Sequence, residues 1–100
     1  MDPEISDLTI SDLVRSIAGR DANELFYVVD CDETFLYLAN GKDRTIEKPK
    51  KKKRKHACKV LRSETRVAEK LRSGDKVLNS ELRRDLAYFG QKLQSNNLGG

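Results

Sequence analysis

Short apolar runs separated by turn-forming residues fill the first half of the chain. These runs span residues 13–17, 25–30 and 34–39. They are rich in β-branched, leucine and aromatic side chains, and each is too short to favour a helix. Residues 20–23 and 31–33 between them are polar, and Asn23 tolerates the left-handed conformation that a tight turn often requires. The pattern predicts three strands, the first of which ends at Gly19.

An Asn-Gly pair directly follows the third run. Asn40-Gly41 between two strand-like segments is a strong hairpin signal, because a type I′ turn needs positive φ at both central residues. A two-residue turn would make residues 42–47 a fourth strand beside the third. The cross-strand pairs expected from this register are Phe35 with Ile46 and Tyr37 with Arg44.

The strand pattern indicates a mainly β fold. Pro49 lacks an N–H group and would end the fourth strand, and residues 57–61 form a fifth short run. Both faces of the second and third strands are apolar, which fits a closed or covered sheet better than a flat one. The expected architecture is therefore a small antiparallel barrel or a strongly curved sheet.

Two short helices are predicted after the strands, over residues 64–72 and 81–89. In the second, apolar residues at i, i+4 and i+7 make one face for packing. The expected caps and stops are Ser63 and Gly74 for the first helix, and Asn79 or Ser80 and Gly90 for the second. The expected organisation is a flexible segment at 1–11, a barrel at 12–61 with a basic loop at 48–56, a helical appendage at 62–94 and a disordered tail at 95–100.

Charge is concentrated in one segment of this 100-residue chain. The formal net charge is +4, with 20 basic and 16 acidic residues, yet residues 48–62 hold nine basic residues and no acidic one. The centre of this segment reads KPKKKKRKH, from Lys48 to His56. Like charges packed this closely repel one another unless an anion relieves them. A nucleic-acid backbone is the commonest such anion.

Other function classes lack the residues they need. The longest apolar runs are five residues, the acidic start does not look like a secretory signal, and two cysteines make no disulfide framework. A cytoplasmic, monomeric protein is expected. The single histidine, His56, has no evident orienting carboxylate, and its spacing to Cys31 and Cys58 does not match a metal site. We therefore predict no catalytic residue, no metal site and no cofactor.

Residues 13–56 resemble the KOW-domain family. The segments that carry the resemblance are LVRSIAGRDANELFYVVD and FLYLANGKDRTIEKPKKKKRKH. The order and spacing of AGRD and KPKKKK are the specific part of the match. The chain looks most like the small bacterial KOW-domain RNA-binding proteins, which are similar to KOW-containing large-subunit ribosomal proteins of archaea and eukaryotes. Asn23 departs from the family, which usually has glycine there.

The resemblance implies an SH3-like barrel followed by the two helices, with two neighbouring loops that contact the RNA backbone. The implied partner is ribosomal RNA or a ribosome-associated complex, with ribosomal or transcription and translation proteins as further partners. Carried over from the family, the implied RNA-binding residues are Arg15, Ser16, Gly19, Arg20 and Asp21 in the first loop, and Lys48, Lys50, Lys51, Lys52, Lys53, Arg54, Lys55 and His56 in the second.

Several alternatives remain open at this level. The lysine run could be a solvated loop, a nuclear import signal or the contact surface of a DNA-binding nucleoid protein. An SH3-like domain could instead bind proteins, which would require an exposed aromatic groove. Tyr37 with Arg44 could be a base-stacking platform or an ordinary cross-strand pair.

Overall fold

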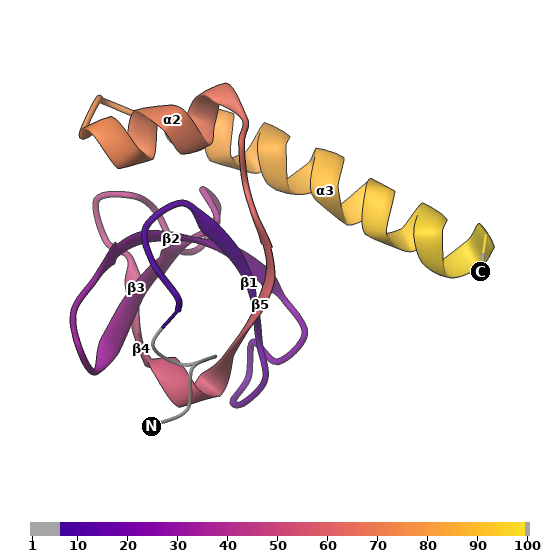
Figure 1. Ribbon diagram of the computed structural model, residues 1–100, viewed down its shortest axis with the longest axis horizontal. Coiled ribbons are helices and arrows are strands. Elements are labelled where there is room, and N and C mark those ends of the chain that lie inside the picture. Colours follow the sequence, from indigo (N-terminus) through magenta and orange to yellow (C-terminus); the bar gives the residue numbers. More distant parts are fainter. Residues whose placement is uncertain (1–6, 100) are drawn as a thin grey trace.

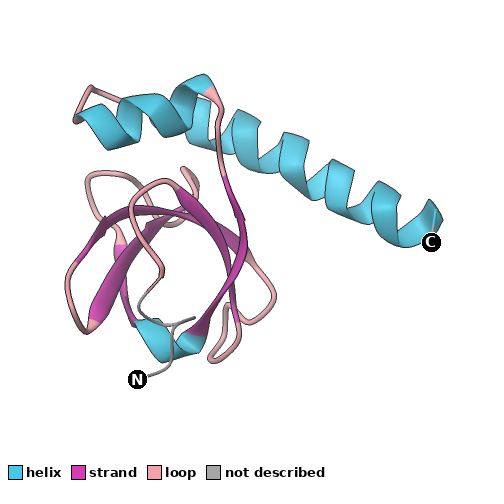
Figure 2. Cartoon of the chain, in the orientation of Figure 1, coloured by secondary structure: helices cyan, strands magenta, loops and turns pink. Residues whose placement is uncertain are grey.

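The computed structural model describes the backbone of residues 7–99 and the side chains of residues 7–93. Five strands precede two helices along the chain (Figures 1 and 2). The strands are β1 (Asp12–Ser16), β2 (Leu25–Cys31), β3 (Phe35–Ala39), β4 (Lys50–Lys53) and β5 (Ala57–Arg62). The 3-10 helix η1 (Arg54–His56) follows β4, and the two helices are α2 (Arg66–Ser73) and α3 (Asn79–Gly99).

The strands form a single antiparallel sheet with the order β4-β3-β2-β1-β5. Figure 1 shows that the sheet is strongly curved, and that η1 connects its two edge strands, β4 and β5. The register shifts within the β1–β5 and β2–β3 pairs, and irregularities of this kind increase bending. The predicted antiparallel sheet followed by two C-terminal helices is confirmed.

An apolar cluster fills the concave face of the sheet. Side chains alternate between the two faces of a strand, so β1, β2 and β3 each send alternate residues inward. The buried members are Leu8, Val14, Phe26, Val28, Leu36 and Leu38. Leu8 is only 3% exposed, so the prediction of a flexible segment at 1–11 is wrong for residues 7–11. Residues 1–6 lie outside the described part of the chain.

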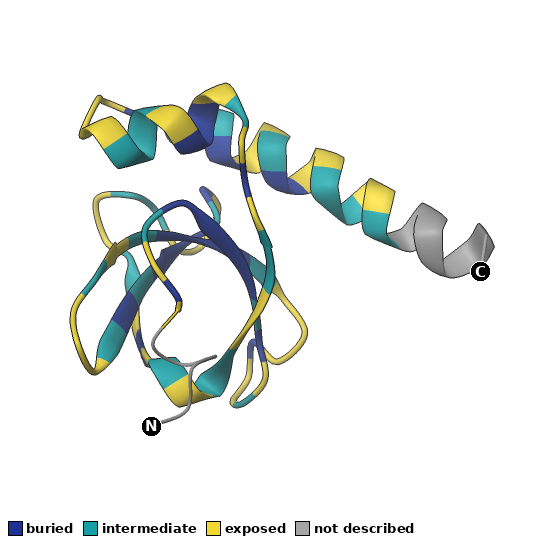
Figure 3. Ribbon diagram, in the orientation of Figure 1, coloured by how far each residue is buried: buried dark blue, intermediate teal, exposed yellow. Residues whose placement is uncertain are grey.

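A second cluster lies between the convex face of the sheet and the two helices (Figure 3). Its buried members are Leu13, Tyr27, Ala39, Val67, Val77, Leu82 and Leu86. Tyr27 is fully buried, and its hydroxyl donates to Asp85 Oδ2 over 2.7 Å. The same carboxylate oxygen accepts from Thr65 Oγ1 over 2.6 Å. Asp85 of α3 thus links β2 to the residue that precedes α2.

The predicted two-residue hairpin at Asn40-Gly41 is wrong. Residues 42–47 form no strand, and their backbone groups bond to Asn40 and to α3 instead of β3: the N–H groups of Lys42 and Arg44 donate to Asn40 Oδ1, and Arg44 O accepts from the N–H groups of Asn40 and Gly41. The backbone N–H of Ile46 donates to Asn79 Oδ1 over 2.9 Å, and Arg83 Nη1 donates to Gly41 O over 2.6 Å. Gly41 does have positive φ, at 80°. The Asn-Gly signal therefore marks a turn inside a longer connection that is docked on α3.

The lysine run is a strand and not the predicted loop. The four lysines of β4 pair with β3, so the expected partners Ile46 and Arg44 are replaced. The observed pairs are Phe35 with Lys53, Leu36 with Lys52, Tyr37 with Lys51 and Leu38 with Lys50. Lysine has little preference for strands, which is why the pattern did not indicate one.

Both helices differ from their predicted limits. Thr65 caps α2 by accepting from the N–H of Ala68, whereas the buried Ser63 contacts the Tyr27 hydroxyl over 2.8 Å. Gly74 ends α2 in the left-handed conformation, as predicted. α3 continues through Gly90 to Gly99, so the predicted stop at Gly90 is wrong, and so is the predicted tail for residues 95–99. Residue 100 lies outside the described part of the chain.

Candidate nucleic-acid interface

Strand β4 divides its lysines between two environments. Lys52 is buried and Lys50 is half-buried, whereas Lys51 and Lys53 are exposed. Lys50 and Lys52 pair with Leu38 and Leu36, whose side chains fill the concave face of the sheet. Since side chains alternate along a strand, one pair of lysines points into the fold and the other pair points outward.

The two inward lysines meet Asp21 of the β1–β2 loop. Lys52 Nζ lies 2.8 Å from Asp21 Oδ1, and Lys50 Nζ donates to Asp21 Oδ2. Lys52 Nζ also donates to Ser16 Oγ over 2.6 Å and to Ala18 O over 2.8 Å. These three acceptors use all three N–H donors of the Lys52 ammonium. Lys52 is therefore fully engaged within the protein.

The Asp21 carboxylate is held in its charged form by this cluster. Burial alone raises the pKa of Asp21, but hydrogen bonds from Lys50, Lys52 and Ser16 outweigh it. The net effect holds the pKa of Asp21 far below its ordinary value of 3.8. Because two ammonium groups flank the Asp21 carboxylate, its repulsion of an approaching phosphate is weak. Its contacts attach the β1–β2 loop to β4.

The conformation of the β1–β2 loop depends on two residues with positive φ. Gly19 has φ 85° and Asn23 has φ 75°, so the prediction that Asn23 adopts the left-handed conformation is confirmed. The N–H of Asn23 donates to Ser16 O over 2.7 Å, which closes the loop. The predicted neighbourhood of the AGRD segment and the lysine run is likewise confirmed by the contacts of Asp21.

Arg20 is exposed and stands next to this cluster in the sequence. Its sequence neighbour Asp21 pairs with Lys50 and Lys52 and forms no ion pair with Arg20. Within residues 7–93, Arg20 forms neither a salt bridge nor a side-chain hydrogen bond. Its guanidinium group is thus available to a ligand.

Two other predicted contact residues have structural partners. Arg54 donates to Leu8 O over 2.7 Å and to Asp32 O over 2.8 Å, which ties η1 to the N-terminal segment and to the β2–β3 turn. Arg15 Nη1 donates to Asn23 O over 2.7 Å. Arg15 and Ser16 are successive residues of β1, so they point to opposite faces of the sheet, and Arg15 lies away from the Asp21 cluster.

Of the cations predicted in the basic segment 48–56, those that remain exposed are Lys48, Lys51, Lys53 and Lys55. None of them forms a salt bridge within the described part of the chain. Lys51 Nζ lies 4.2 Å from the centroid of the Phe35 ring, a cation–π contact. His56, at the end of η1, is half-buried. Sequence analysis missed Phe35 as a neighbour of this surface because the register of β3 with the lysine strand was not predicted.

Tyr37 and Arg44 do not lie opposite each other, so neither the ordinary cross-strand pair nor the base-stacking platform forms. Tyr37 lies opposite Lys51, and its hydroxyl donates to Asp32 Oδ2 over 3.4 Å. Arg44 belongs to the connection that is docked on α3. The platform hypothesis in its predicted form is therefore wrong.

No family model matches the chain, and no curated protein matches it either. Among the described side chains, no three histidine, cysteine, aspartate or glutamate residues are grouped as metal ligands. Cys31 is half-buried and Cys58 is exposed, and both are free thiols. Within residues 7–99, no helix has both the length and the apolar character that crossing a membrane requires.

Proposed function

We propose that this protein is a non-catalytic RNA-binding protein with a KOW-type, SH3-like barrel, and that its partner is ribosomal RNA or a ribosome-associated complex. The proposal rests on how the side chains of the lysine run are divided between the inside and the surface of the fold. Asp21 forms salt bridges with the two inward lysines, and four exposed lysines remain without salt bridges in the described part of the chain, on and beside one short strand. The strong curvature of the sheet and the short connection between β4 and β5 support the barrel (Figure 1).

The arrangement suits the recognition of a phosphate backbone. Contacts to phosphates contribute affinity and position the protein without reading sequence. Lys51, Lys53 and Lys55 are fixed at their backbones by β4 and η1, while their ammonium groups reach into solvent. Arg20 adds a planar guanidinium group that can hold a phosphate through two hydrogen bonds.

Binding is expected to depend on the outward lysines and strongly on salt. Replacing Lys51, Lys53 and Lys55 together by serine removes three phosphate contacts. The slope of log affinity against log salt should flatten by about 2–3, from about 0.7–0.9 per contact. RNA affinity measured over a salt series gives this slope. The fold should be retained, because none of these lysines forms a salt bridge with another described residue. A triple variant with the wild-type slope would exclude this surface as the phosphate site.

Arg20→Ala is expected to weaken RNA binding without destabilising the protein. The loss of a charged, bidentate contact should cost about 1–3 kcal/mol of binding free energy. The melting temperature should stay close to that of the wild type, because Arg20 has no partner among the described residues. Arg66→Ala, which removes an exposed arginine on α2, is the matched control and should change neither quantity. Full RNA affinity in Arg20→Ala would remove Arg20 from the interface.

The identity of the partner is tested by crosslinking in cells followed by sequencing of the attached nucleic acid. Ribosomal RNA reads would support the proposal, whereas DNA reads would favour the nucleoid alternative. The absence of any crosslinked nucleic acid would favour a protein-binding module.

A further inference from the structure

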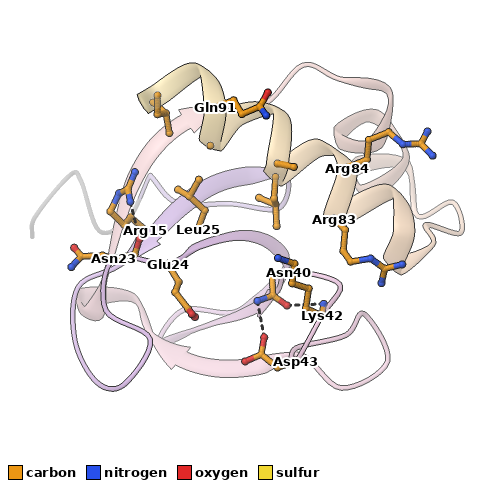
Figure 4. Close-up of a pocket in the computed structure, with 14 residues that line it drawn as sticks. Arg15, Asn23, Glu24, Leu25, Asn40, Lys42, Asp43, Arg83, Arg84 and Gln91 are labelled. Carbon is orange, nitrogen blue, oxygen red and sulfur yellow. Dashed lines mark hydrogen bonds between the residues drawn. The ribbon is translucent and has the colours of Figure 1, made fainter. Parts of the chain in front are cut away.

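A cavity of about 840 Å³ opens between α3, the start of β2 and the connection after β3 (Figure 4). Its volume falls in the range of about 300–1,000 Å³ that is typical of small-molecule sites. None of the exposed lysines of β4 or η1 lines it, so it is distinct from the phosphate surface proposed above. We call it the α3 groove.

The floor and one wall of the α3 groove are apolar. Leu25 comes from β2, and Leu86, Ala87 and Leu93 come from α3. Leu25 lies at the centre of the view in Figure 4, and Gln91 is held above it by α3. Ala87 and Gln91 are exposed and one helical turn apart, so they form a small and accessible stretch of the wall. This surface can accept a flat group beneath α3.

The rim of the groove carries an excess of positive charge. Four cations line it, namely Arg15, Lys42, Arg83 and Arg84, against the two acids Glu24 and Asp43. Arg15 and Arg83 donate to the backbone carbonyls of Asn23 and Gly41, which fixes their position and leaves their charge uncompensated. Asp43 already accepts a hydrogen bond of 2.9 Å from Asn40. The rim therefore favours an anionic ligand.

An exposed aromatic ring stands beside the groove. Tyr88 is 51% exposed and follows Arg84 by one turn on α3, so the two side chains are neighbours on the helix surface. Bases of single-stranded nucleic acids stack on such rings, and their phosphates pair with nearby arginines. Asn23 and Glu24 belong both to the groove and to the loop that carries Arg20. The groove is thus connected through a single loop to the phosphate surface.

We infer that the α3 groove binds an unpaired nucleotide of the same RNA, with its base against Leu25 and Leu86 and its phosphate on Arg15 or Lys42. The inference rests on the proposed function. Phosphate contacts on β4 and η1 suit any RNA backbone, whereas the proposed contact of a single base with Leu25 and Leu86 requires a base that is not paired. The protein should therefore prefer RNA in which an unpaired strand adjoins the contacted backbone.

The experiment compares two RNA probes, an unstructured oligouridylate and a blunt RNA duplex. Ala87→Glu places a negative charge and a larger side chain on the groove wall at an exposed helical position. We expect its affinity for the oligouridylate to fall about tenfold or more, while its affinity for the duplex stays near that of the wild type. Gln91→Glu adds the same charge with almost no change in shape and should give a smaller loss of the same kind.

Ser80→Glu is the matched control, because it adds the same charge at an exposed position of α3 outside the groove. It should bind both probes as the wild type does. If Ala87→Glu loses affinity equally for both RNAs, or for neither, the inference about the α3 groove is overturned while the proposed function stays intact. Oligoglutamate serves as a third probe. If Ala87→Glu binds oligoglutamate less well than the wild type but binds both RNAs equally well, the nucleotide proposal is overturned and the groove is assigned to an acidic peptide. A wild-type protein that binds neither RNA would overturn both proposals.

Discussion

Gly41→Ala is expected to destabilise the fold strongly, although it adds only one methyl group. Gly41 has φ 80°, and a Cβ added there would lie 2.3 Å from the backbone oxygen of Asn79 at the start of α3. The left-handed conformation costs an alanine about 1–2 kcal/mol. Displacing packed backbone adds about 1–3 kcal/mol. We expect a loss of about 2–5 kcal/mol in the free energy of unfolding, measured by urea denaturation.

Gly74→Ala is the control that separates the two contributions. Gly74 has nearly the same φ, at 77°, but a Cβ there would meet no atom within 4 Å. This variant should therefore show only the conformational cost of about 1–2 kcal/mol. Equal losses in the two variants would mean that the connection after β3 does not pack on α3 as described.

Asp21→Asn is expected to destabilise the fold by about 3–5 kcal/mol, because it leaves the buried Lys52 ammonium without its counter-charge. The side chains of Asp21 and Lys52 are 10% and 7% exposed, so solvent screens the charge poorly. Glu24→Gln removes an exposed carboxylate from the same loop and should change stability by no more than about 0.5 kcal/mol. Wild-type stability in Asp21→Asn would show that the cluster contributes nothing to the fold.

The contacts of Asp21 with Lys50, Lys52 and Ser16 predict that the stability of the fold depends on pH in the acid range. The pKa of Asp21 is lower in the folded protein than its ordinary value of 3.8, so the folded state binds the proton less well than the unfolded state. The contribution of Asp21 is fully present above pH 3.8 and decreases as the pH falls below that value. The difference in stability between the wild type and Asp21→Asn should therefore narrow in acid. A constant difference down to low pH would contradict this assignment.

These expectations also bear on RNA binding. Asp21 fastens the loop that carries Arg20 to the strand that carries Lys51 and Lys53. A variant that loosens this attachment should weaken RNA binding even though Asp21 itself contacts no phosphate. In the interface proposed above, Ser16, Asp21, Lys50 and Lys52 are positioning residues, and Arg20 and the exposed lysines are the proposed contacts to RNA.

Local sequence patterns determined much of the fold. The apolar runs of β2, β3 and β5 appear where they were predicted, because each has too few residues for a helix and side chains suited to a pleated surface. The first run is also a strand, but β1 ends at Ser16 and not at the predicted Gly19. Asn23 and Gly74 adopt the left-handed conformation that their residue types allow at low cost. The concentration of charge between residues 48 and 62 was likewise visible without any structure.

Contacts between distant segments decided the rest. The lysine run becomes a strand because β3 offers a free edge and Asp21, 29 residues before Lys50, forms salt bridges with both inward lysines. Residues 42–47 lose their predicted strand because Asn79 and Arg83 of α3 bind that connection. α3 passes through Gly90, where a Cβ would stand 4.0 Å from a side-chain carbon of Leu25 of β2. Periodicity and residue type report local preference, and they carry no information on which remote carboxylate, carbonyl or helix end will reach a given residue. The sequence by itself therefore determined the approximate positions of β1, β2, β3 and β5 and of the cations along the chain. Only the tertiary structure decided that the lysine run is a strand and which of its cations remain free to bind.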